Sequence, residues 1–87
     1  MNIRILQSQK EYLVKCVLQE RENLVQDIEK GKLFNNKWEI DITNDAADEI
    51  RDLCLEKLQT VGFDEKYKLS RQGKVLEDLI DVFYVSR

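Results

Sequence analysis

The sequence predicts an all-α fold, a small antiparallel bundle of three helices. The chain of 87 residues contains no proline and only three glycines, so residues that interrupt helices are rare. Apolar residues recur at helical spacing in three segments, about 8–30, 44–61 and 70–84. A hydrophobic content of 43% in so short a chain is enough for one modest core. We therefore expect one helical domain over residues 1–87.

The first helix is predicted over residues 8–30. Ser8 and Glu11 have the spacing of a capping box, in which each side chain satisfies a free backbone N–H of the first turn. Ile3 and Leu6 continue its apolar face toward the N-terminus, so the sequence also allows an earlier start or a further short helix there. The longer form would extend beyond its shorter partner helices. Such an apolar overhang favours a second subunit, and a structural homo-oligomer or adaptor is therefore one candidate function.

Residues 32–42 connect the first helix to the second. Trp38, Ile40 and Ile42 alternate with charged residues, as in a short strand. With no second strand expected, we predict an extended segment laid across the end of the bundle. Trp38 has two interpretations, a lid on the core or an exposed anchor for a partner protein.

The second helix, after an N-cap at Thr43 or Asn44, has two opposed faces. Its apolar side is formed by Ala46, Ile50, Leu53, Cys54, Leu58 and Val61. Its far side is acidic and contains Asp45, Asp48, Glu49, Asp52 and Glu56. Acids in the first turn are favoured by the helix dipole, but Asp52 and Glu56 lie too far along for that explanation. The acidic side is either a solvated face or a docking surface for a basic partner.

The third helix is predicted over residues 70–84, with Ser70 as its N-cap. In the linker before it, Phe63, Tyr67 and Leu69 are expected to contact the core.

Three polar or reactive residues lie within the apolar patterns. Arg21 interrupts the face of the first helix, and we expect its guanidinium to reach a neighbouring acid, with a role in binding as the alternative. Cys16 and Cys54 lie beside apolar neighbours and are expected to be buried free thiols, with a disulfide or a reactive role as the alternative.

The composition argues against catalysis. Without any histidine, a Ser-His-Asp or Cys-His arrangement is excluded. The stretch from Asp41 to Asp52 has acids at some positions of a calcium loop, but Ala46 replaces the required glycine and the last position lacks glutamate. We therefore predict no enzyme activity, no metal and no cofactor.

The charge of the chain limits its partners. The formal net charge is −3, and all of it comes from residues 43–87. Such a chain repels phosphate backbones, so we expect no direct contact with nucleic acid. No apolar run has the length of a membrane span and no secretion signal is recognisable, so we expect a soluble, cytoplasmic protein.

Two stretches, GFDEKYKLSRQGKVLEDLIDVF at 62–83 and ADEIRDLC at 47–54, are similar to a pattern in small bacterial immunity proteins of contact-dependent and other polymorphic toxin systems. The resemblance covers residues 43–87. It implies that the chain inhibits a basic toxin, a nuclease for which an RNase of the EndoU type is one candidate, by covering its active site with an acidic face. The predicted contact residues are Trp38, Asp41, Asp48, Asp52 and Glu56.

Overall fold

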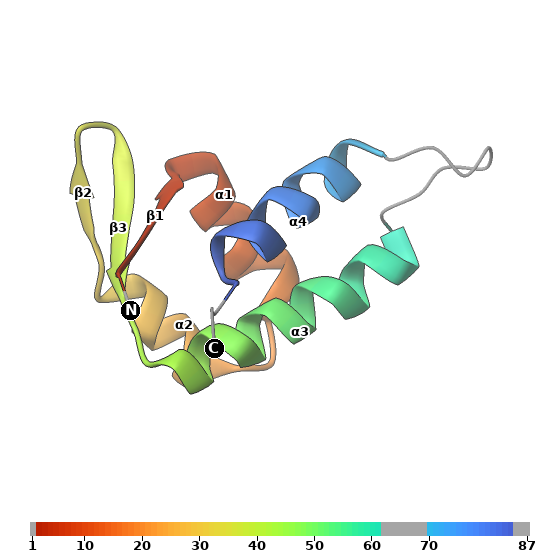
Figure 1. Ribbon diagram of the computed structural model, residues 1–87, viewed down its shortest axis with the longest axis horizontal. Coiled ribbons are helices and arrows are strands. Elements are labelled where there is room, and N and C mark those ends of the chain that lie inside the picture. Colours follow the sequence, from red (N-terminus) through yellow and green to blue (C-terminus); the bar gives the residue numbers. More distant parts are fainter. Residues whose placement is uncertain (1, 62–69, 85–87) are drawn as a thin grey trace.

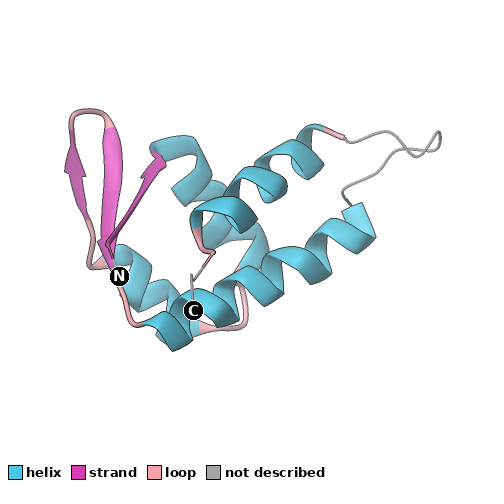
Figure 2. Ribbon diagram, in the orientation of Figure 1, coloured by secondary structure: helices cyan, strands magenta, loops and turns pink. Residues whose placement is uncertain are grey.

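The computed structural model describes residues 2–61 and 70–84 and shows an antiparallel sheet packed against helices (Figure 1). The elements are β1 (Asn2–Leu6), α1 (Gln7–Tyr12), a π-helical segment η1 (Leu13–Val17), α2 (Glu22–Glu29), β2 (Lys32–Phe34), β3 (Lys37–Asp41), α3 (Asn44–Val61) and α4 (Arg71–Val82). The sheet lies at one end of the molecule, and α3 and α4 extend away from it (Figure 2). The predicted all-α three-helix bundle is therefore wrong, and the fold is mixed α and β.

The sheet has the strand order β1-β3-β2, with β3 in the centre. Ile3 lies opposite Ile40, and Ile5 lies opposite Trp38. Side chains alternate between the faces of a strand, so these four residues share the face that packs on the helices. The sequence Ile3-Arg4-Ile5 has the period of a strand, and the helix allowed at the N-terminus is wrong. The helical overhang expected from Ile3 and Leu6 is absent as well, because both residues belong to a paired strand, in which Ile3 is buried in the core and Leu6 is 49% exposed.

A tight hairpin joins β2 to β3. Asn35 and Asn36 both have positive φ angles, 49° and 65°, and Phe34 and Lys37 face each other on either side of them. Positive φ at both central residues is characteristic of a type I′ turn, whose twist matches that of the strands. The prediction of an unpaired segment over 32–42 is wrong, because β3 has a partner strand on each side.

The helix predicted over residues 8–30 is broken into three parts. It begins after Leu6, whose backbone N–H donates to Gln9 Oε1 at 2.8 Å, so Ser8 does not cap it. At the end of η1, the N–H of Leu18 donates to the carbonyl of Leu13 at 2.9 Å, a π-type bond across five residues. The chain then turns before α2 begins, which brings α2 against β3.

One close contact fixes the junction of α2 with the sheet. Trp38 Nε1–H donates to the carbonyl of Ile28 at 2.8 Å. Gly31 lies beside this bond, where a Cβ atom would be 2.5 Å from both Trp38 Nε1 and the carbonyl oxygen of Glu39. Glycine is therefore required here by the close approach of the chain to β3.

The second and third predicted helices are present as α3 and α4, which pack along each other. Thr43 Oγ1 accepts the N–H of Ala46 at 3.1 Å, and Ser70 Oγ accepts that of Gly73 at 3.0 Å, so both helices have their expected caps. The predicted contacts of Phe63, Tyr67 and Leu69 lie outside the described residues. The core combines sheet and helices and contains Ile3, Ile5, Leu13, Leu18, Leu24, Ile28, Ile40, Ile42, Ala47, Ile50, Cys54, Leu76, Leu79, Ile80 and Phe83.

Candidate functional site

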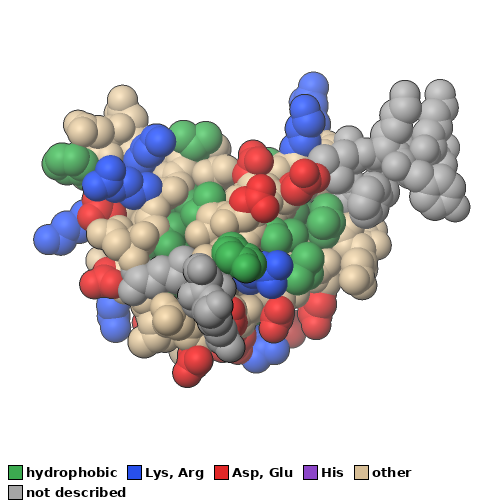
Figure 3. Space-filling model, in the orientation of Figure 1, with side chains coloured by type: hydrophobic (Ala, Val, Ile, Leu, Met, Phe, Trp, Pro, Cys, Tyr) green, Lys and Arg blue, Asp and Glu red, His purple; other side chains and the backbone are tan. Residues whose placement is uncertain are grey.

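The outer side of α3 is the surface that the sequence marks as functional. Its inner side is fully buried at Ile50 and Cys54, which fixes the rotation of the helix. Asp45, Asp52 and Glu56 are exposed on the outer side. Figure 3 shows acidic side chains along the border of the molecule formed by α3, and a second acidic group over α4.

Asp52 and Glu56 follow each other at a spacing of one helical turn. Both side chains are exposed, and neither carboxylate has an ion pair or hydrogen bond with any of residues 2–61 or 70–84. Like charges at this spacing destabilise a helix by about 0.2–0.5 kcal/mol. The fold therefore carries two adjacent negative charges that its described cations leave uncompensated.

Two other acids of α3, Glu49 and Asp48, are less available to a partner protein because each already interacts within the chain. Glu49 Oε1 lies 3.5 Å from Arg21 Nη1, which joins the loop before α2 to α3. This partly exposed pair contributes at most about 1 kcal/mol to stability. Arg21 thus reaches an acid of another helix, as expected, but from an exposed loop rather than from an apolar helix face. Asp48 is half-buried and also interacts with another group.

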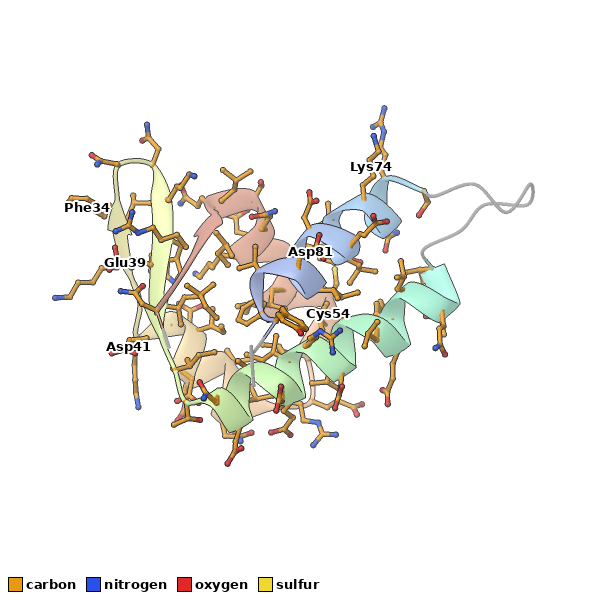
Figure 4. The ribbon with its side chains drawn as sticks, in the orientation of Figure 1. Phe34, Glu39, Asp41, Cys54, Lys74 and Asp81 are labelled. Atoms are coloured by element: carbon orange, nitrogen blue, oxygen red, sulfur yellow. The ribbon has the colours of Figure 1, made fainter. Side chains whose placement is uncertain are left out.

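Trp38 and Asp41 do not join this surface. The Trp38 ring is half-buried against the core, with Lys10 Nζ 4.6 Å from its centroid. Lys10 is itself held by Glu29 at 3.0 Å. Asp41 lies on the sheet, before α3 begins (Figure 4). Of the five predicted contact residues, the structure places Asp52 and Glu56 together in exposed positions.

A cleft of about 380 Å³ borders the acidic side of α3. One wall comes from the end of η1 and the following loop, and the other comes from α3. It is lined by Cys16, Val17, Gln19, Glu20, Arg21, Leu53, Glu56, Lys57 and Thr60. Isolated π-helical turns occur frequently at functional sites. Glu20 and Glu56 thus line the same cleft from two elements, together with the cations Arg21 and Lys57 and with apolar Val17 and Leu53.

This cleft was not predicted, because the apolar pattern favours one continuous helix over residues 8–30. The polar run Gln19-Glu20-Arg21, between Leu18 and Leu24, was the available signal. We name the exposed acids Asp45, Asp52 and Glu56, together with Glu20 across the cleft, the α3 acidic surface.

A larger hollow of about 650 Å³ lies beside β2. Its charged lining contains both signs, from Arg4, Lys30 and Lys32 and from Asp27, Glu39 and Asp41. Arg4 Nε lies 3.5 Å from Glu39 Oε2 within it. In this it resembles the cleft beside α3, where Arg21 and Lys57 line the same space as Glu20 and Glu56; what distinguishes the α3 acidic surface is the exposed pair Asp52 and Glu56, without an ion pair to the described residues.

The two cysteines are free, and they differ in burial. Cys54 is completely buried, and this burial raises the pKa of its thiol to about 12. A thiol held protonated in this way is a poor nucleophile. Cys16 is half-buried on the wall of the cleft, so only one of the two predicted buried thiols is fully enclosed.

Residues 2–61 and 70–84 contain no cluster of three or more acids and cysteines arranged to hold a metal ion. None of the helices in the same ranges has both the length and the apolar character needed to cross a membrane.

Comparisons of the chain with models of protein families, with curated proteins and with solved structures find no match.

Proposed function

We propose that this protein is a non-catalytic protein-binding module whose α3 acidic surface docks onto a basic partner protein. The observation that supports this proposal is the exposed, uncompensated pair Asp52 and Glu56 on a helix fixed by its buried side. A cationic surface would relieve the repulsion between these carboxylates on binding. Charge complementarity of this kind also accelerates association and fixes the register of a complex.

The cleft beside α3 gives the proposed interface a shape as well as a charge. Its volume of about 380 Å³ exceeds that of one side chain, and Glu20 and Glu56 flank it. A lysine or arginine of the partner, inserted in the cleft, would place its stem on Val17 and Leu53 and its charge near the two carboxylates, beside Lys57 and the Glu49-paired Arg21 of the same lining. Direct binding of nucleic acid is disfavoured at the same surface, because phosphates carry the same sign of charge.

In its specific form, the proposal is that the chain is an immunity protein that neutralises a toxic nuclease. The resemblance of residues 43–87 to such proteins implies this role, and those residues include the whole of α3. A nuclease cleft is basic because it holds phosphates, so an acidic helix can occupy it in place of the substrate. This proposal places the protein in the cytoplasm.

The probe in this test is a domain of another protein. It is the C-terminal domain of the protein encoded immediately upstream of this chain's own gene. Calorimetry measures its affinity for the native chain and for the double variant Asp52→Lys/Glu56→Lys. We expect the double variant to bind about 30-fold or more weakly, which corresponds to about 2 kcal/mol, the scale of an interface hot spot. Inhibition of that domain's nuclease activity should be lost in parallel.

The matched control is Glu11→Lys/Glu77→Lys. These two acids are exposed on α1 and α4, and the double variant changes the net charge by the same amount. We expect it to bind within about threefold of the native chain, since charges away from an interface are screened by salt. Equal weakening by both variants would show a non-specific charge effect, and unchanged affinity of the Asp52→Lys/Glu56→Lys variant would remove α3 from the interface. No binding by the native chain would refute the immunity role.

A further inference from the structure

Among residues 2–61 and 70–84, strand β2 is a free edge of the sheet. In the order β1-β3-β2 it has a partner strand on one side only. Leu33 and Phe34 are 53% and 59% exposed there, among the largest apolar exposures of the described residues. Figure 4 shows Phe34 projecting away from the molecule at this edge. An exposed apolar edge strand is a template for pairing with another strand.

The hairpin determines which backbone groups are available. Phe34 and Lys37 face each other across a two-residue turn, and in such a hairpin this pair exchanges both of its backbone hydrogen bonds. Hydrogen-bonding directions alternate along a strand. The N–H and C=O of Leu33 therefore point away from β3, toward the free edge.

We propose that two copies of the chain associate through β2, paired antiparallel with Leu33 of each copy facing Leu33 of the other. The two Leu33 residues would exchange both outward backbone hydrogen bonds across a two-fold axis. The sheets of the two copies would become one continuous sheet. This interface is separate from the α3 acidic surface, and it goes beyond the proposed function.

The sequence of β2 is complementary to itself in this register. Lys32 of one copy lies opposite Phe34 of the other, on the outer face of the sheet. An ammonium group or its alkyl stem packs favourably on an aromatic ring, and no like charges are opposed. On the other face, Leu33 lies opposite Trp38 of β3, so the Leu33 pair extends the apolar surface of the core. This match favours a second copy over a foreign strand.

The expected dimer is weak. A strand of three residues buries less than the roughly 1,000 Å² of a stable interface. We expect a dissociation constant on the order of 100 µM. The association depends on apolar and backbone contacts, so it should be insensitive to salt, unlike binding at the α3 acidic surface.

Sedimentation equilibrium of the full chain between about 20 µM and about 1 mM tests the proposal, because this range brackets the expected constant. Leu33→Pro removes the outward N–H and the apolar side chain without removing a bond to β3. It should weaken the dimer at least tenfold. The matched control is Leu6→Glu, since Leu6 is the exposed apolar residue of the opposite edge strand, at 49%. It should leave the dimer unchanged.

A second variant keeps the test valid if Leu33→Pro does not fold. Phe34→Lys changes an exposed side chain and places a lysine opposite Lys32 of the other copy, so it should also weaken the dimer at least tenfold. In the native chain, the Leu33 amide should gain protection from hydrogen exchange as the concentration rises. A native chain that stays monomeric at about 1 mM would overturn the proposal. The proposal would also be overturned if the dimer were lost on Leu6→Glu but survived the changes at Leu33 and Phe34, because the interface would then lie at β1.

Discussion

Replacement of Gly31 with alanine should destabilise the fold by about 2–4 kcal/mol. The added Cβ would lie 2.5 Å from the carbonyl oxygen of Glu39 and from Nε1 of Trp38. The Glu39 oxygen belongs to the backbone of the central strand, so it cannot rotate away as the end of a flexible side chain would. The end of α2 or β3 must therefore move.

The magnitude follows from two terms. Overpacking of a filled site costs about 1–3 kcal/mol. The shift also disturbs the 2.8 Å bond from Trp38 Nε1–H to Ile28, which is worth about 0.5–1.5 kcal/mol. Gly31 does not have a positive φ angle. Without the crowding, alanine would therefore be neutral or stabilising by up to about 1 kcal/mol, because it restricts the unfolded chain.

Urea denaturation, followed by fluorescence, is the assay, since Trp38 is the single tryptophan and reports on this junction. Helical circular dichroism should give the same midpoint if unfolding is two-state. Lys32→Ala, an exposed neighbour, is the control and should change stability by less than about 0.5 kcal/mol. Equal or greater stability of the Gly31→Ala variant would refute the close approach of residue 31 to β3.

Three further outcomes are expected. Asn36→Val should cost about 1–2 kcal/mol, because a β-branched residue is strained at the observed φ of 65°, whereas Asn36→Gly should be neutral or stabilising; urea midpoints compare the two. A thiol reagent at pH 8 should label Cys16 first, because a pKa of about 12 lowers the thiolate fraction of Cys54 about a thousandfold relative to its ordinary pKa of 9.0. The same shift means that the folded state keeps a proton that the unfolded chain releases near pH 9, so stability should fall between about pH 9 and 12.

Different results would contradict the predictions for Asn36 and for the cysteines. Equal destabilisation by both Asn36 variants would argue against a left-handed residue in the turn. Rapid labelling of Cys54 in the folded chain, at a rate equal to that of Cys16, would contradict its burial. Mass spectrometry of the labelled peptides distinguishes the two thiols.

The acidic side of α3 shows what periodicity can predict. A helix of 18 residues has a spacing that assigns every position to a face, so the exposure of Asp52 and Glu56 followed from the apolar positions alone. The sequence predicted that Arg21 reaches a neighbouring acid, but it did not identify that acid as Glu49 of α3. The geometry of this ion pair depends on the loop between η1 and α2, where the sequence predicted a continuous helix.

The N-terminal third was misread because short elements give ambiguous periods. Ile3, Leu6 and the residues after them fit a helical stripe, but Ile3 and Ile5 fit a strand equally well. A strand of five residues is stable only with a partner, and its partner β3 lies more than thirty residues away in the chain. Pairing over such a separation leaves no local signal.

The sequence by itself determined the two C-terminal helices, a cap at Ser70, a cap at either Thr43 or Asn44, and the sign of charge on the outer side of α3. Each of these depends on residues within a few turns of one another. Only the tertiary structure decided that a sheet exists, that Trp38 faces the helices, and that β2 is left with a free edge. Strand pairing and close packing depend on groups that are distant in the chain, and their free energy appears only when the whole core is assembled.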